Sequence, residues 1–211
     1  TSVSSLSNWN NIAAVIRRHM EQSRHLLIVC SAASQISNKL EQLIGAAILG
    51  DYELLLDDIV TSYQTLAKEL ELNFDRIVLG DVIQLRRLIE GVVLLGEVSP
   101  KIQAQILAFG ELAVTKLGAE FLKRSGINVA WQDARHHLKS ADDRTHDRTK
   151  SYIQAYCDFE KDTELKQRFE EMPSTVLLTQ GFIASNSRQE TVLLGRGGSD
   201  TSAAYFAAKL Q

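Results

Sequence analysis

Apolar residues gather along the chain in short continuous runs, separated by longer segments with helical periodicity. Residues 26–30 are apolar throughout, and residues 127–131, 176–179 and 191–194 form further short, mainly apolar runs. Runs of this length favour strands, and the run at 26–30 predicts a strand buried on both faces. Because such strands alternate with helices, we expect an α/β fold with a mainly parallel sheet sandwiched by helices.

Between these runs, apolar positions recur every three or four residues. This spacing predicts helices over residues 7–22, 38–49, 100–126 and 159–172, with Ser7 as the N-cap of the first. Residues 51–96 are helical in pattern almost throughout, and no strand is expected among them. We therefore interpret residues 1–211 as one domain that carries a helical insertion at residues 51–98.

A glycine-rich loop follows the last predicted strand. Residues 195–200 read Gly-Arg-Gly-Gly-Ser-Asp and lead into an alanine-rich helix. Glycines let a backbone approach a ligand closely, and the first amides of a helix have no partner within it. With the helix dipole and the Arg196 guanidinium, these amides predict a site for a carboxylate or phosphate. Ligands of parallel sheets bind beyond the carboxyl ends of the strands, where we also expect the loops after residue 30 and at residues 180–182.

Glu111 is a second candidate, because it falls within an apolar stripe of the helix predicted from residue 100. A buried carboxylate needs a partner, since burying the charge alone is costly. The partner is either an arginine or lysine of the fold or the ammonium group of a ligand. Gly110 beside it weakens the helix by roughly 1 kcal/mol relative to alanine, which is tolerable if another segment packs closely there.

Hydroxyl groups follow the first predicted strand at Ser31, Ser34 and Ser37. They either cap the next helix or, if they face the glycine-rich loop, contact a ligand. Asp200 is either a first-turn acid that is favourable to the helix dipole or a group that orients a lysine or a metal-bound water at a phosphate site.

Composition limits the partners and the location that we expect for this protein. The chain has a net charge of -3 with no concentrated basic stripe, which excludes nucleic acid as an expected partner. No apolar run reaches the length of a membrane span, and the N-terminus shows no signal-peptide pattern, so we expect no membrane association. Cys30 and Cys157 follow no disulfide pattern, which favours reduced thiols and a cytoplasmic location.

The polar stretch at residues 136–147 contains three histidines and three aspartates. Their spacing matches no compact ligand motif, so we interpret the stretch as a solvated loop and expect no protein metal site there.

Three sets of motifs resemble the aspartokinases of the amino acid kinase family. Residues 179–183 (Thr-Gln-Gly-Phe-Ile), followed by residues 194–200 (Leu-Gly-Arg-Gly-Gly-Ser-Asp), form a combination highly specific to aspartokinases. Residues 29–32 with 36–38, and Phe109-Gly-Glu, match two further family motifs in the right order. The resemblance covers essentially the whole chain, although the helical block matches only in character.

The resemblance implies a reaction in which ATP, with Mg²⁺, phosphorylates the side-chain carboxylate of L-aspartate to give aspartyl 4-phosphate and ADP. This is the first step of lysine, threonine and methionine biosynthesis. By the same resemblance, Glu111 accepts from the α-ammonium of aspartate, Arg196 holds its α-carboxylate, and Ser37 also contacts it. The loop beside the reacting groups is set by Gly197, Gly198 and Ser199.

The resemblance further implies two catalytic residues. Ser31 lies close to the phosphoryl path, and Asp200 organises a lysine of the family's opening Lys-Phe-Gly-Gly-Thr-Ser motif. Thr1 and Ser2 are remnants of that motif, which forms a loop on the triphosphate. The Lys-Phe-Gly-Gly segment, most of the nucleoside pocket and the family's regulatory ACT domains are absent. We therefore expect an amino-terminal piece of a longer, homo-oligomeric enzyme that is inactive alone.

Some positions depart from the family pattern. Ser37 stands where threonine is usual, Gln35 where glycine is common, and Ala108 and Val114 flank Glu111 where hydroxyl residues are common.

Three alternatives to a monofunctional aspartokinase stay open. They are the kinase part of a bifunctional aspartokinase/diaminopimelate decarboxylase, an amino acid kinase acting on glutamate or a carbamate, and a non-catalytic amino acid-binding or regulatory module.

Overall fold

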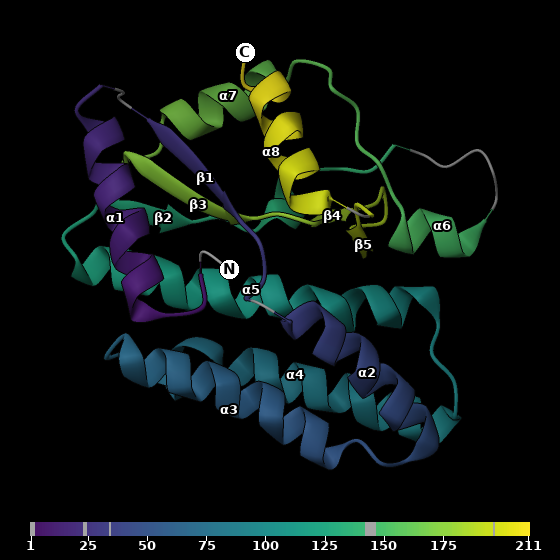
Figure 1. The fold of residues 1–211 in the computed structure, drawn as a ribbon. Coiled ribbons are helices and arrows are strands. Elements are labelled where there is room, and N and C mark those ends of the chain that lie inside the picture. Colours follow the sequence, from purple (N-terminus) through teal and green to yellow (C-terminus); the bar gives the residue numbers. More distant parts are fainter. Residues whose placement is uncertain (1–2, 23–24, 34, 142–146, 196) are drawn as a thin grey trace.

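The computed structural model describes residues 3–22, 25–33, 35–141, 147–195 and 197–211. It has an α/β fold, as expected (Figure 1). None of the described helices is both long and apolar enough to cross a membrane. The elements follow in the order α1 (Leu6–Met20), β1 (Leu26–Cys30), α2 (Ile36–Leu49), α3 (Glu53–Glu69), α4 (Phe74–Leu95), α5 (Pro100–Arg124), β2 (Val129–Trp131), η1 (Ala134–His136), α6 (Arg148–Ile153), α7 (Thr163–Glu170), β3 (Val176–Gln180), β4 (Ile183–Ser185), β5 (Thr191–Leu193) and α8 (Gly198–Lys209).

The main sheet is parallel, with strand order β1-β3-β2. Leu26 pairs with Val176 and Cys30 with Gln180, so β1 and β3 end at the same edge. The central strand β3 is buried along its whole length. The expectation that β1 is buried on both faces is wrong for its first four residues. Within the described part of the chain β1 pairs only with β3, and residues 26–28 border an open apolar groove beside α1.

The strand at residues 191–193 lies outside the main sheet. It pairs antiparallel with β4, which the sequence did not predict, and the two strands form a hairpin. All six strand residues of this hairpin are buried. The hairpin matters for function because β5 leads directly into the glycine-rich loop and α8.

Helix α5 separates two layers of the molecule. In Figure 1 it runs between the sheet and the helices α2, α3 and α4, whereas α7 and α8 lie on the opposite side of the sheet. This central position explains why α5 is apolar on more than one face, since one face meets strands and another meets helices. At Gly118 the contact is so close that an added Cβ would lie 1.9 Å from the fully buried Trp9 ring of α1.

The helical block at residues 51–98 consists of α3 and α4, with no strand, as the periodicity predicts. Its buried apolar side chains join a single core with those of the sheet and of the remaining helices. The interpretation of this block as an insertion stays a prediction.

Three helix starts differ from the sequence prediction, in each case at the cap. Ser5, rather than Ser7, caps α1, and its Oγ accepts from the amide of Asn8 at 3.3 Å. Gln35 precedes α2 with φ +65°, in the left-handed region that favours glycine. Helix α7 begins at residue 163 rather than 159, because the Asp162 carboxylate accepts from the amide of Leu165 at 2.8 Å and fixes the start there.

Candidate functional site

A cavity of about 280 Å³ opens where the carboxyl ends of β1 and β3 meet the start of α8. The three loops that the sequence places at this edge therefore do converge. Most of the candidate residues lie around this one space, together with Phe182 and Ala32. Its lining consists of Ser31, Ala32, Ser37, Glu111, Phe182, Gly195, Gly197, Gly198, Ser199 and Asp200.

Glu111 brings an incompletely bonded carboxylate to this cavity. Its side chain is only 3% exposed, and Oε1 accepts from the amide of Ala32 at 3.3 Å. Oε2 is buried and has no hydrogen-bond partner within the described part of the chain. Burial raises the pKa of Glu111 to about 8, although backbone hydrogen bonds, including that of Ala32, act in the opposite direction. Of the two readings of Glu111, the described residues supply no arginine or lysine partner, which favours a ligand cation.

Gly110 allows this carboxylate to reach the end of β1. A Cβ at residue 110 would lie 3.1 Å from both Ala32 Cβ and Ile36 Cγ2, so α5 touches the start of α2 here. Tyr63 Oη donates to the Gly110 carbonyl at 2.8 Å and fixes the same turn of α5 from the side of α3. Another segment therefore does pack closely against Gly110, which is the condition under which a glycine is tolerable here.

The start of α8 forms the opposite wall of the cavity. Gly197 adopts φ +73° at the N-cap and turns the chain into the helix. The first amides of α8 lack carbonyl partners within the helix, which is the arrangement expected of an anion site. Asp200 lies in the first turn and is exposed. Ser202 Oγ accepts from the Phe182 amide at 3.0 Å and donates to the Gly198 carbonyl at 2.5 Å, which attaches this turn to the β3–β4 connection.

Of the serines after β1 that the structure describes, neither Ser31 nor Ser37 caps α2. Gln35 occupies the cap position without a side-chain hydrogen bond, whereas Ser31 and Ser37 line the cavity. Thr1, Ser2, Ser34 and Arg196 lie outside the described residues. The anchoring role of Arg196 and the phosphate-loop roles of Thr1 and Ser2 therefore stay predictions.

The histidine-containing stretch takes a structural role where it is described. Residues 142–146, with Asp142, Asp143 and His146, lie outside the described residues. His137 Nε2 lies 3.0 Å from Gln132 Oε1, and its ring meets Phe169 edge-on at 4.9 Å between centroids. Burial, with smaller contributions from Arg168 and His136, lowers the pKa of His137 to about 4.

The buried His137 side chain is expected to make the folded protein less stable in acid. Its pKa lies near 6.5 in an unfolded chain and near 4 in the fold, so the unfolded state binds the proton more tightly. The free energy of unfolding is therefore expected to fall as the pH drops through this window. Chemical denaturation from pH 7 to pH 4 measures it, with His137→Phe expected to flatten the profile and His136→Asn, which removes only a minor contribution, to change it much less. An unchanged slope in His137→Phe would contradict the assignment.

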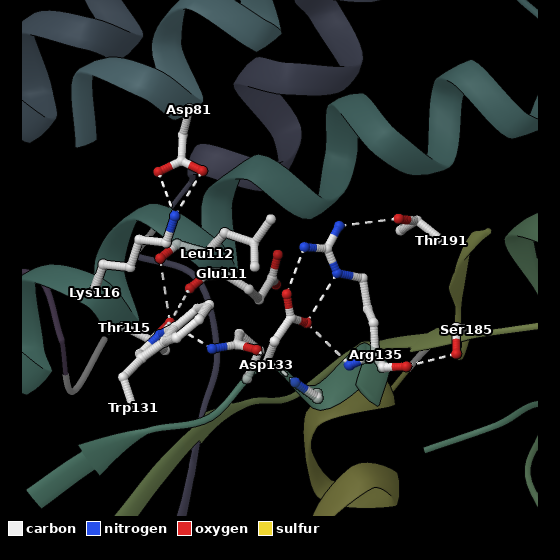
Figure 2. A network of polar contacts seen from close by, with 12 residues as sticks. Asp81, Glu111, Leu112, Thr115, Lys116, Trp131, Asp133, Arg135, Ser185 and Thr191 are labelled. Atoms are coloured by element: carbon white, nitrogen blue, oxygen red, sulfur yellow. Dashed lines mark hydrogen bonds and ion pairs between the residues drawn. The ribbon is translucent and has the colours of Figure 1, made fainter. Parts of the chain in front are cut away.

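Beside the cavity lies a polar network that was not predicted from the sequence (Figure 2). It joins Thr115 of α5, Trp131 of β2, Gln180 of β3 and the ion pair of Asp133 and Arg135. The available signals were weak: a threonine within an apolar helix stripe and a glutamine at the end of an apolar strand. Only the fold shows that these positions face one another.

Comparison with known proteins gives a consistent picture. The family model described as "Amino acid kinase family" matches residues 1–211. The bifunctional aspartokinase/homoserine dehydrogenase of Buchnera aphidicola is 26% identical over 219 residues, covering 100% of this chain and 26% of that protein. The lysine-sensitive aspartokinase 3 of Escherichia coli is 29% identical over 218 residues, covering 100% of this chain and 45% of that protein.

Solved structures agree with this result. The crystal structure of E. coli aspartokinase III in complex with aspartate and ADP (R-state) superposes with a TM-score of 0.79 at 27% identity, covering 99% of this chain and 45% of that one. The complex of the same enzyme with lysine and aspartate (T-state) gives a TM-score of 0.72 at 26% identity, again over 99% and 45% of the two chains. The chain thus spans less than half the length of these relatives.

Proposed function

The chain belongs to the amino acid kinase family, and we propose that it forms the aspartate-binding part of an aspartokinase, which transfers a phosphoryl group from ATP to the side-chain carboxylate of L-aspartate. The observation that carries this proposal is the buried Oε2 of Glu111, which has no hydrogen-bond partner among the described residues; Glu111 lines a cavity whose opposite wall is a helix N-terminus. This pairing of an acceptor for an ammonium group with donors for a carboxylate suits an α-amino acid.

In the proposed complex, Glu111 accepts a hydrogen bond from the α-ammonium group of aspartate. The first amides of α8 and the guanidinium of Arg196 receive the α-carboxylate, and Ser37 provides a hydroxyl at the cavity wall. An amino acid held at both ends directs its side-chain carboxylate in one orientation. Such positioning is the main requirement of the reaction, since the acceptor carboxylate is already ionised at pH 7.

In the transfer itself, a carboxylate oxygen forms a bond to the γ-phosphorus of ATP while the bond from that phosphorus to the β–γ bridging oxygen breaks. No proton needs to be moved, and the products are aspartyl 4-phosphate and ADP. Ser31, exposed at the cavity, lies close to the phosphoryl path in this scheme, and Asp200 orients a lysine from another part of the enzyme. Gly197, Gly198 and Ser199 shape the loop beside the reacting groups.

Mg²⁺ accompanies ATP in this proposal. The described residues contain no group of three potential metal ligands, which fits an ion held mainly by substrate phosphates. Asp200 is an exposed carboxylate at the cavity. Carboxylates of this kind bind Mg²⁺ directly or through one of the water molecules that the ion keeps. Mg²⁺ supplies neutralisation of the charge on the transferring phosphoryl group.

The remaining expectations stay proposals. These are a fusion to diaminopimelate decarboxylase, homo-oligomerisation, a cytoplasmic location, and a role in lysine biosynthesis. The Buchnera aphidicola relative is named as a bifunctional aspartokinase/homoserine dehydrogenase and the E. coli relative as a lysine-sensitive aspartokinase, and neither name includes a decarboxylase.

Coupled ADP release by the full-length protein, with acyl phosphate trapped by hydroxylamine, tests the function. We expect ADP and hydroxamate to form in equal amounts with L-aspartate, and at least about tenfold less with L-glutamate, whose longer chain misplaces the carboxylate. A protein that binds aspartate without releasing ADP would indicate the non-catalytic binding module instead. Preference for glutamate would indicate another kinase of the family.

A further inference from the structure

Thr115 is the centre of the polar network beside the cavity. Its side chain is fully buried, one helical turn after Glu111. Thr115 Oγ1 donates to the Glu111 carbonyl at 2.7 Å and accepts from Trp131 Nε1 at 3.0 Å, as Figure 2 shows. It also accepts from Gln180 Nε2 at 2.9 Å. The Leu112 carbonyl lies farther from the hydroxyl, at 3.3 Å, so the Glu111 carbonyl is the nearer acceptor. The hydroxyl therefore uses its one donor and both acceptor positions.

Gln180 carries the connection to the other wall of the cavity. It is the last residue of β3, is fully buried, and its Oε1 accepts from the amide of Ala134 at 2.8 Å. The next residue, Gly181, packs so closely on the first turn of α8 that an added Cβ would lie 2.6 Å from Ser199 Cα. A shift of Gln180 along the strand direction would thus move the contact with α8.

A second branch of the network holds the hairpin that precedes α8. The Arg135 guanidinium forms two hydrogen bonds to the Asp133 carboxylate, Nε to Oδ1 at 2.9 Å and Nη2 to Oδ2 at 2.6 Å, and its Nη1 donates to Thr191 Oγ1 of β5 at 3.1 Å. Burial alone would raise the pKa of Asp133, but the hydrogen bonds and charge of Arg135 outweigh it and hold the pKa below its usual range. Because Ala134 lies between these two residues, both branches meet at η1.

We propose that Thr115 and Gln180 are positioning residues for the amino acid substrate. Their hydrogen bond sets the separation between Glu111 at one end of the cavity and the first turn of α8 at the other. The inference rests on the proposed function, in which the two ends of the cavity hold the two charged groups of one ligand. A change of about 1 Å between these ends would misalign the ligand carboxylate, which is costly in reactions that depend on orientation.

Thr115→Val tests this in the full-length protein, because it preserves side-chain shape and removes the hydroxyl. We expect the KM for L-aspartate to rise at least about tenfold while the KM for ATP changes less than about twofold. Thr115→Ser is expected to restore the parental value. Trp131→Phe is the matched control, because it removes the other donor to the same oxygen and leaves the bond of Gln180 in place.

The outcomes separate a positioning role from a stabilising one. If Thr115→Val and Trp131→Phe lower the melting temperature alike and neither changes the KM for aspartate, the network only stabilises the fold and the proposal is wrong. Should Thr115→Val fail to fold, Gln180→Asn is the second variant. It shortens the side chain by one methylene and breaks the hydrogen bond to Thr115, so we expect the same rise in the KM for L-aspartate. A parent protein that neither binds nor phosphorylates aspartate would overturn the proposed function itself, rather than this inference alone.

Discussion

Glu111→Gln is expected to lower kcat/KM for L-aspartate by about 10- to 150-fold, and at the same time to stabilise the unliganded protein at pH 8. The loss follows from removing a charged acceptor for the ligand ammonium group, a hydrogen bond worth about 1.5–3 kcal/mol. The gain follows because the carboxylate is 3% exposed and lacks a partner at Oε2 in the described structure, whereas a neutral amide costs less to bury.

The pKa of Glu111 determines how the stability of the protein changes with pH. The carboxyl of Glu111 has a pKa of about 8 in the fold against 4.5 as its ordinary value, so the folded state binds its proton more tightly. Its contribution to stability is present below about pH 4.5 and is lost as the pH rises towards 8. The stability of Glu111→Gln should therefore fall less over this range than that of the parent.

The same titration affects binding. Glu111 must be ionised to accept from an ammonium group, so the affinity of the parent for aspartate should increase from pH 6 to pH 8, and that of Glu111→Gln should not. Calorimetric titration and urea denaturation across this range measure both effects. Glu90→Gln, at an exposed position on α4, is the control and should change neither. If Glu111→Gln bound aspartate normally, the carboxylate would have no role in recognition.

Much of this architecture follows from local patterns. The strand at Leu26–Cys30 and the helix from Pro100 were predictable because apolar periodicity and a Ser-Pro start are properties of neighbouring residues. The cavity was predictable in outline, because strands of a parallel sheet end at a common edge. Glu111 stood out because a carboxylate in an apolar stripe requires an explanation.

What the sequence did not reveal depends on contacts between distant segments. Strand β4 is three residues long and follows Phe182 at φ +68°, so it has no pattern of its own and is formed by pairing with β5. Thr115 and Gln180 are separated by 65 positions and become partners only once β3 lies against α5. Hydrogen-bond networks of this kind form only in the tertiary fold, and the periodicity of apolar residues along the sequence does not indicate them.

Gly181→Ala is expected to cause the second large loss of function, because the added Cβ presses on the wall of the cavity opposite Glu111. A Cβ at this position would lie 2.6 Å from the Cα, Cβ and Oγ atoms of Ser199, and the Cα cannot rotate away as the end of a side chain can. The first turn of α8 must then move relative to β3, and the hydrogen bond from the Phe182 amide to Ser202 Oγ must lengthen. We expect a destabilisation of about 1–3 kcal/mol, typical of overpacking.

The functional effect should exceed the effect on stability, because the displaced amides are those that receive the ligand carboxylate. We expect the KM for L-aspartate to rise at least about tenfold in protein that remains folded. Gly91→Ala is the matched control: it lies within α4 with nothing within 4 Å of its added Cβ, and should stabilise the helix by up to about 1 kcal/mol without changing KM. Parental KM values in Gly181→Ala would mean that α8 can shift without affecting the substrate, and that its first turn is not the carboxylate site.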